Sequence, residues 1–139
     1  MKLIVDTNIL YSYFWKDSIT KKMLISQDFE LCSPEFALEE INKYKNDIMK
    51  KNNLSLKEFE KTRLDIAIAV KFIPLKEYSA LLKPALKICP DKNDVDFFAL
   101  ALKMKLPLWS NDVRLKNQTV VAVISTKELI SMPLHGKDL

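Results

Sequence analysis

Two aspartates follow what we predict to be the ends of buried strands. Asp6 comes directly after the apolar run at residues 3–5, and Asp112 comes after a second run at 106–110. Ligands of parallel α/β sheets bind beyond the carboxyl ends of the strands, so both carboxylates are placed for chemistry. An aspartate between a strand and a helix is also a favoured helix cap. Taken singly, each aspartate is better explained as a cap than as a functional group.

Glu40 lies on the apolar side of a helix that we predict over about 35–50, with Ser33 as its cap and Pro34 at its first position. The apolar stripe of this helix consists of Phe36, Ala37, Ile41, Tyr44 and Ile48. Glu40 falls inside the stripe, whereas Glu39 falls outside it. Burying an ionised carboxylate is costly unless it is paired or neutralised. Glu40 therefore needs a Lys or Arg partner, a bound proton or a metal ion.

A third candidate acid lies in the segment that begins at Asp91. With Asp91 as the cap of a helix over 92–103, Asp94 falls in the first turn, where the helix dipole favours a carboxylate. At about 100° per residue, Asp94 shares a face with Phe98 and Ala101, and Asp96 falls on the opposite side. We therefore expect Asp94 at the site. Asp96 stays open as an alternative ligand because it is only one turn away.

The four acids Asp6, Glu40, Asp94 and Asp112 make one kind of site if the fold brings them together. Several carboxylates in one place repel one another and raise each other's pKa. A divalent cation offsets that repulsion, and ligands that are all oxygen suit Mg²⁺ or Mn²⁺ rather than zinc. The sequence therefore predicts a site for Mg²⁺ or Mn²⁺.

Short apolar runs alternate with helical patterns along the whole chain. Such runs are typical of buried strands in a parallel sheet, and we expect strands at 3–5, 30–33, 72–75, 106–110 and 119–124. We expect helices at 8–15, 19–26, 35–50, 55–70, 76–87 with a break at Pro84, 92–103 and 126–130. This alternation predicts one domain over residues 1–139, a three-layer α/β/α sandwich around a mainly parallel five-stranded sheet.

Composition excludes several classes of function. The chain has 139 residues, is 48% hydrophobic and carries a net charge of +4, which suits a packed core and a polyanionic partner. His135 and Gly136 are its only histidine and glycine, which argues against paired-histidine catalysis and glycine-rich phosphate loops. Cys32 and Cys89 belong to no CxxC pattern, so we expect small buried hydrophobes. No stretch approaches the roughly 20 apolar residues of a membrane span, so we expect a cytoplasmic protein with no membrane partner.

Four segments in this order resemble the PIN-domain ribonucleases, a family that includes toxins of the VapC type. They are VDTNIL at 5–10, SP at 33–34 with LEEI at 38–41, DKND at 91–94 followed by FFALAL at 97–102, and LWSND at 108–112. Each segment alone is degenerate, but four of them at suitable spacing form a specific pattern. The resemblance implies the sandwich fold described above and an endoribonuclease that hydrolyses single-stranded RNA with Mg²⁺ or Mn²⁺.

The resemblance also implies roles for single residues. The metal ligands would be the four acids named above, and Asn8 and Ser110 would orient carboxylates or water. One or two metal ions would activate water for attack on phosphorus, leaving a 5′-phosphate and a 3′-hydroxyl. Asn111 stands where many relatives have glycine, which should matter little because Asn tolerates turn conformations. Family members also suggest three properties beyond the site: a homodimer, a role as the toxin of a toxin–antitoxin pair, and an antitoxin protein as partner.

Basic and aromatic residues near the acids are candidate RNA contacts. Arg114 and Lys116 follow Asp112 and must lie near the pocket, so we expect them to bind the RNA backbone. Segment 43–63 holds seven basic residues against three acids, which fits an RNA track or, at least as well, a solvated lysine-rich hairpin. Four aromatic side chains after Asn8 can stack on bases, although packing in a core or an interface is their expected role: Tyr11, Tyr13, Phe14 and Trp15.

Two other classes of protein fit part of the pattern. A PIN-like scaffold or RNA-binding subunit that no longer cleaves is the main alternative, and the presence of all four acids argues against it. A receiver-type α/β protein would use Asp6 as a phosphate acceptor. That class needs an acidic pair around the first strand, which this chain lacks.

Overall fold

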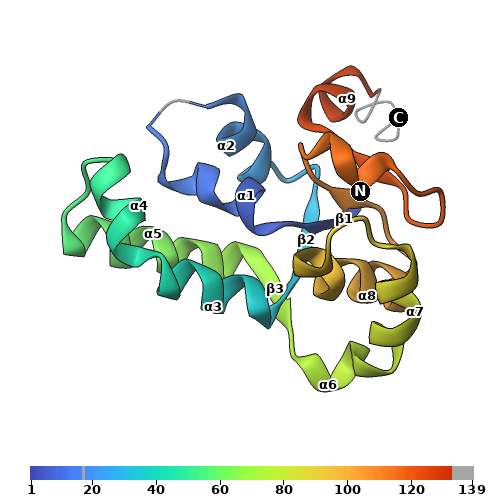
Figure 1. Cartoon of the computed structure of the whole chain (residues 1–139). Helices are drawn as coiled ribbons and strands as arrows, with labels where there is room; N and C mark the ends of the chain where they lie inside the picture. The colour runs from blue at the N-terminus through green and yellow to red at the C-terminus, as the bar shows by residue number, and fades with distance from the viewer. Residues whose placement is uncertain (17, 133–139) are drawn as a thin grey trace.

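A computed structural model describes residues 1–16 and 18–132 and places a five-stranded, all-parallel sheet at the centre of the molecule (Figure 1). The strand order is β3–β2–β1–β4–β5. The strands are β1 (Lys2–Val5), β2 (Glu30–Pro34), β3 (Val70–Ile73), β4 (Leu108–Trp109) and β5 (Val123–Ile124). The expected α/β sandwich is confirmed. His135 and Gly136 lie outside the described residues.

Helices connect every pair of successive strands except β4 and β5, which a single short 3₁₀ turn joins. The α-helices are α1 (Thr7–Leu10), α2 (Ile19–Leu24), α3 (Glu35–Lys43), α4 (Lys45–Lys51), α5 (Leu56–Ala69), α6 (Leu75–Tyr78), α7 (Leu82–Ile88), α8 (Val95–Met104) and α9 (Thr126–Ser131). The 3₁₀ helices are η1 (Tyr11–Phe14), η2 (Ser79–Leu81), η3 (Lys92–Asp94) and η4 (Val113–Lys116). Across residues 1–16 and 18–132, no helix combines the length and the apolar character that crossing a membrane requires.

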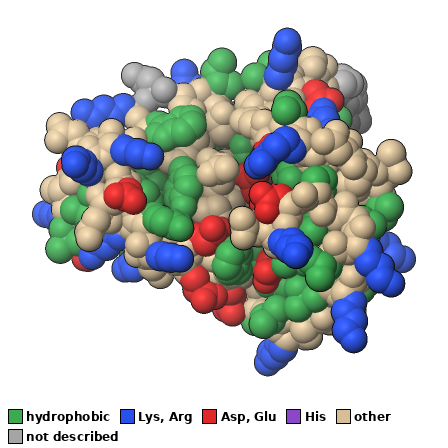
Figure 2. All heavy atoms as spheres, viewed as in Figure 1, with side chains coloured by type: hydrophobic (Ala, Val, Ile, Leu, Met, Phe, Trp, Pro, Cys, Tyr) green, Lys and Arg blue, Asp and Glu red, His purple; other side chains and the backbone are tan. Residues whose placement is uncertain are grey.

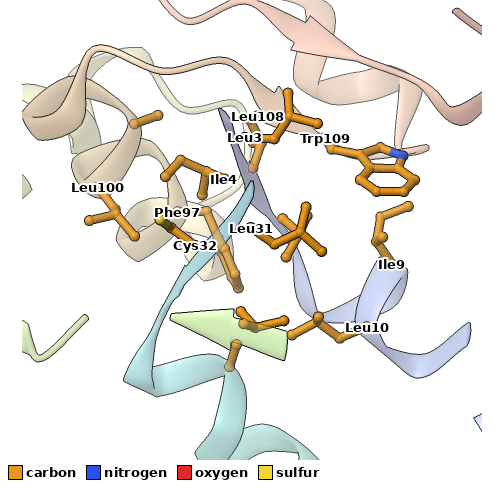
Figure 3. Packing of buried hydrophobic residues seen from close by; sticks show 14 of the residues in the cluster. Leu3, Ile4, Ile9, Leu10, Leu31, Cys32, Phe97, Leu100, Leu108 and Trp109 are labelled. Atoms are coloured by element: carbon orange, nitrogen blue, oxygen red, sulfur yellow. The ribbon is translucent and has the colours of Figure 1, made fainter. Parts of the chain in front are cut away.

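The central strand β1 is buried on both faces because helices cover the sheet from both sides. Figure 1 shows α1, α2 and α5 on one side of β1 and β2, and α8 with α7 on the other. In Figure 3, Ile4 and Cys32 lie on the same side as Leu100 of α8, whereas Trp109 lies with Ile9 on the other. This placement follows the parallel register, which pairs Ile4 with Cys32 and Val5 with Trp109. Cys32 is buried as expected, and Cys89 is half-buried; both are free thiols.

The predicted helix over 35–50 is two helices. The backbone at Tyr44 has φ −99° and ψ 19°, which ends α3 and begins α4. Tyr44 is consequently exposed, while Ile41 before it and Ile48 after it are buried. The apolar stripe is therefore interrupted at Tyr44. The prediction of one continuous stripe was wrong there.

Other boundaries also differ from the predicted ones, and strand β4 covers only Leu108–Trp109 rather than 106–110. Pro84 does not break a helix, because it occupies the first turn of α7, where a backbone N–H would have no helical acceptor. Strand β3 begins at Val70, directly after α5, and ends before Pro74, which begins α6. Strand β5 is only two residues long because Gln118 occupies the preceding backbone groups. Its Oε1 accepts from the N–H groups of Val120 and Val121, both at 2.9 Å.

The strand order creates a switch point between β1 and β4. From β1 the chain moves outward to β2 and then β3, and it afterwards crosses back to β4 on the other side of β1. A crevice forms where neighbouring parallel strands send their connections in opposite directions, beyond their carboxyl ends. Asp6 follows β1 and Ser110 follows β4, so both lie at this crevice.

Candidate metal centre

Asp6 is both a helix cap and a buried acid at the switch point. Its Oδ1 accepts a hydrogen bond of 2.9 Å from the backbone N–H of Ile9, which caps α1. The side chain is nevertheless only 5% exposed. Burial raises the pKa of Asp6 to about 6, with a smaller contribution from the charges of Asp112 and Glu40 and against the lowering effect of hydrogen bonds from Ser110 and Ile9. The cap explanation is therefore correct but incomplete.

Glu40 reaches the same place from α3. It is half-buried, and its Oε1 accepts a hydrogen bond of 2.6 Å from the hydroxyl of Thr7 on α1. Among the described residues, no Lys or Arg forms an ion pair with Glu40. Its partner is thus a neutral hydroxyl, which brings no positive charge to the site.

Thr7 is a residue of the site that the sequence argument missed. The available signal was its place between Asp6 and Asn8 in the first turn after a central strand.

Asp94 faces the pocket from the start of α8. Burial, together with the charges of Asp91, Asp6 and Asp112, raises its pKa to about 6. Asp96 is placed differently, because its Oδ2 accepts a hydrogen bond from the phenol of Tyr78. The structure thus brings Asp94 to the other acids, while Asp96 pairs with a side chain at the end of α6.

Asp112 lies beside the other acids but is held by an arginine. Arg114 donates to both carboxylate oxygens, from Nε to Oδ1 at 3.1 Å and from a terminal nitrogen to Oδ2 at 2.8 Å. These bonds lower the pKa of Asp112. The same terminal nitrogen lies 3.7 Å from Oδ2 of Asp91. The backbone N–H of Asp112 donates to the hydroxyl of Ser110 at 3.1 Å, so Ser110 contacts both strand-end aspartates.

These side chains surround a pocket of about 100 Å³. Its lining residues are Asp6, Thr7, Asn8, Tyr11, Glu40, Asn93, Asp94 and Phe97. Three of the four predicted acids and Asn8 therefore line one pocket, and Asp112 acts on it through its charge. Lys116 is directed elsewhere, because it forms an ion pair with Glu128. Figure 2 shows acidic side chains gathered near the middle of the molecule, where the sequence segments of the site meet.

The donor chemistry of the pocket fits a hard divalent cation. In the part of the chain that the structure describes, no three acidic side chains converge as a ready-made cage. Three of the four acids are instead held by their own hydrogen bonds, Asp6 by Ile9, Glu40 by Thr7 and Asp112 by Arg114. Mg²⁺ binds well in such a setting, because it usually keeps several waters and needs only one or two direct carboxylate ligands. A cation would also offset the mutual repulsion that raises the pKa values of Asp6 and Asp94.

The aromatic segment after Asn8 divides into two parts. Tyr13 and Phe14 are buried, and Phe14 stacks on Phe59 of α5 with ring centroids 5.2 Å apart. Tyr11 is half-buried at the pocket, and Trp15 is 43% exposed. Core packing is therefore confirmed for Tyr13 and Phe14, whereas Trp15 lies outside the core, and its place in an interface stays a prediction.

An all-parallel sheet with acidic side chains at its switch point defines an α/β protein with a candidate ligand site beyond the carboxyl ends of its strands. The sequence model of the PIN domain matches residues 4–132. The chain belongs to the PIN domain family. A comparison with curated proteins gives no match. PIN domains are generally nucleases and typically use divalent metals.

Proposed function

We propose that the chain is a Mg²⁺- or Mn²⁺-dependent endoribonuclease that hydrolyses phosphodiester bonds in single-stranded RNA. The observation that carries this proposal is the meeting of Asp6, Glu40 and Asp94 at one pocket, within reach of the charge of Asp112. Helix capping alone does not explain why acids from four separate segments of the chain lie close together. Family membership supports the nuclease class.

In this proposal each residue of the pocket has a positional task. Asp6, Glu40, Asp94 and Asp112 would hold the metal, which when bound lowers the pKa of water and offsets charge on the scissile phosphate. Thr7 fixes the carboxylate of Glu40, and Ser110 fixes the two strand-end aspartates. The amides of Asn8 and Asn93 at the pocket wall would orient the phosphate or the attacking water. Water attack on phosphorus would release a 3′-hydroxyl and leave a 5′-phosphate.

The decisive experiment is cleavage of an end-labelled single-stranded RNA in Mg²⁺, in Mn²⁺ and in EDTA. Asp6→Asn, Glu40→Gln and Asp94→Asn should each lower the rate by more than about 100-fold, since even residues behind metal ligands cost 10- to 100-fold. Asp65→Asn is the matched control, because Asp65 is an exposed acid of α5 paired with Lys61. Asp96→Asn separates the two candidate ligands and should keep most of the activity.

Failure of the wild-type chain to cleave RNA in either metal would reject the enzyme and favour a non-cleaving RNA-binding or scaffold subunit. The toxin role is tested separately by expressing the wild type and Asp6→Asn in bacteria: growth arrest by the wild type alone supports it. A homodimer and an antitoxin partner belong to the same proposal, and the mass of the purified chain in solution tests the dimer.

A further inference from the structure

A groove next to the acidic pocket is the second concave feature of this face. It lies between η1 and α4 and encloses about 450 Å³, which is within the range of pockets that hold small organic ligands. Its lining residues are Tyr11, Trp15, Tyr44, Asp47, Ile48, Lys51 and Asn52. The pocket encloses only about 100 Å³, so a group as large as a nucleobase fits the groove better than the pocket.

The two cavities share a wall, because Tyr11 lines both of them. A chain molecule with one of its phosphates at the acids would therefore pass directly into the groove. Figure 2 shows a hydrophobic surface between α4 and α1, with acidic side chains on the side toward the middle of the molecule. The groove is thus adjacent to the proposed active site across Tyr11.

Aromatic rings rather than aliphatic chains make up the exposed apolar surface of the groove. Trp15 is 43% exposed and Tyr44 is 42% exposed, while Ile48 between them and the core is buried. Exposed rings at a single-stranded nucleic acid site stack on bases of any sequence. Asp47 and Asn52 in the same wall supply polar atoms that can hydrogen-bond to base edges.

Two lysines lie close to these rings. Residues 43–51 carry four lysines against the single acid Asp47. Lys51 lines the groove, and Nζ of Lys43 lies 5.4 Å from the centroid of the Tyr44 ring. Lysines beside stacking rings suit a polyanion whose bases enter the groove while its phosphates stay outside. This positive charge would not stabilise a bound apolar protein segment.

We infer that the groove binds a nucleobase of single-stranded RNA by stacking on Trp15 and Tyr44, next to the bond to be cut. This inference rests on the proposed nuclease function for the position of the cut bond, but base binding itself requires no catalysis. The groove would set which nucleotide lies beside the scissile phosphate. Arg114 and Lys116 do not line this groove and play no part in it.

Trp15 makes the inference directly measurable. The chain has two tryptophans, and the other one, Trp109, is 0% exposed and donates from Nε1 to Thr126. Quenching of the emission by a base therefore reports on Trp15. The experiment titrates the wild-type chain in EDTA, where no cleavage occurs, with a short oligoadenylate and with an abasic strand of the same length and charge.

We expect the oligoadenylate to quench Trp15 and to bind at least about 5-fold more tightly than the abasic strand. Trp15→Ala and Tyr44→Ala should each weaken oligoadenylate binding between about 5- and 150-fold, the range for losing one stacked base. Trp15→Phe should restore most of the affinity without the quenching. Ile68→Ala, a truncation of an exposed side chain on α5, is the control and should leave affinity unchanged.

Equal affinity for the two strands would overturn the inference, and so would full affinity of both alanine variants. A shift of Trp15 emission that depends on protein concentration without RNA would show that a second copy of the chain covers the groove, which also overturns it. The proposed nuclease can fail independently: base-dependent binding without any cleavage would leave the groove assigned and remove only the enzyme. Cleavage of RNA together with equal affinity for both strands would keep the nuclease and remove the assignment of the groove.

Discussion

The acidic pocket and the apolar core meet at two consecutive residues, Val5 and Asp6. Val5 is completely buried in the core, and Asp6, the next residue, is buried at the pocket. Burial stabilises the fold at Val5, because apolar surface leaves water. Burial destabilises it at Asp6, because an ionised carboxylate loses its hydration among other negative charges. Two neighbouring residues at the end of β1 therefore have opposite effects on stability. The destabilising one, Asp6, is the proposed metal ligand.

The largest effect should come from the core. Phe59→Ala removes a completely buried ring that stacks on Phe14. We expect a loss of about 3–5 kcal/mol of unfolding free energy, as for other large-to-small core substitutions. Urea unfolding followed by circular dichroism measures it. Leu64→Ala, on the exposed face of the same helix, should stay within about 0.5 kcal/mol of the wild type.

A substitution in the pocket should raise the unfolding free energy, whereas the core substitution lowers it. The pKa of Asp6 rises from 3.8 to about 6 on folding, so the folded state binds the proton more tightly than the unfolded chain does. The cost of ionisation is absent below pH 3.8, grows between 3.8 and 6 and is complete above 6. Asp6→Asn removes the charge and keeps an acceptor for Ile9. It should therefore stabilise the metal-free protein by about 3 kcal/mol at pH 8 and much less at pH 4.

Unfolding of both proteins in EDTA across this pH range provides the measurement. The two unfolding curves should converge as the pH falls. A variant that is less stable than the wild type at pH 8 would show that the hydrogen bonds of Asp6 outweigh its desolvation, and the proposed opposition between core and pocket would fail.

A smaller effect is expected from the residue that positions Glu40. Thr7→Val removes the hydroxyl that donates to Oε1 of Glu40 and should reduce RNA cleavage by about 10- to 100-fold, as for other groups behind metal ligands. Thr7→Ser keeps the hydroxyl and should retain most of the rate. Titration with Mn²⁺ should restore part of the activity of Thr7→Val if metal affinity is what was lost. Equal rates for the two variants would contradict the positioning role.

The smallest effect should appear only in a pH profile. Arg114 lowers the pKa of Asp112 and also that of Asp94, which lies at about 6. Arg114→Ala should therefore raise both pKa values and, through Asp94, move the acidic limb of the cleavage profile to higher pH. Activity at pH 6 should then fall more than activity at pH 8. Lys116→Ala is the matched control, since Lys116 pairs with Glu128 and leaves Asp112 in its present contacts. Identical limbs for all three proteins would contradict this role of Arg114.

Sequence reasoning predicted the first two strands well because short apolar stretches mark them, residues 3–5 in β1 and Leu31 with Cys32 in β2. Residues 3–5 and 30–33 were placed to within a residue, and both pair in the all-parallel sheet. The misplaced boundaries are those at which local contacts override hydrophobicity. Gln118 binds backbone groups that would otherwise extend β5, and the backbone turns at Tyr44 inside an apolar stripe. Neither feature produces a periodic pattern of apolar residues from which it could be predicted.

The candidate site was predictable in its acids and less so in its neighbours. Helical phase separated Asp94 from Asp96, because the two side chains differ by about 200° around the helix. The structure places Asp94 at the pocket and Asp96 against Tyr78. The hydroxyl of Thr7 and the pairing of Arg114 with Asp112 depend on side-chain directions that spacing does not fix. The groove joins η1 to α4, which are separated by about 30 positions in the chain, and no local pattern reveals such a meeting.

Tyr11 carries a consequence for the products of the reaction. The buried carboxylate of Asp6, the shared wall at Tyr11 and the exposed ring of Trp15 belong to one uninterrupted run of ten residues, 6–15, across α1 and η1. The spacing between the cut bond and the held base would therefore be built into a single short stretch of backbone. Fragments of different RNAs should then all end at the same number of nucleotides from the base that the groove holds.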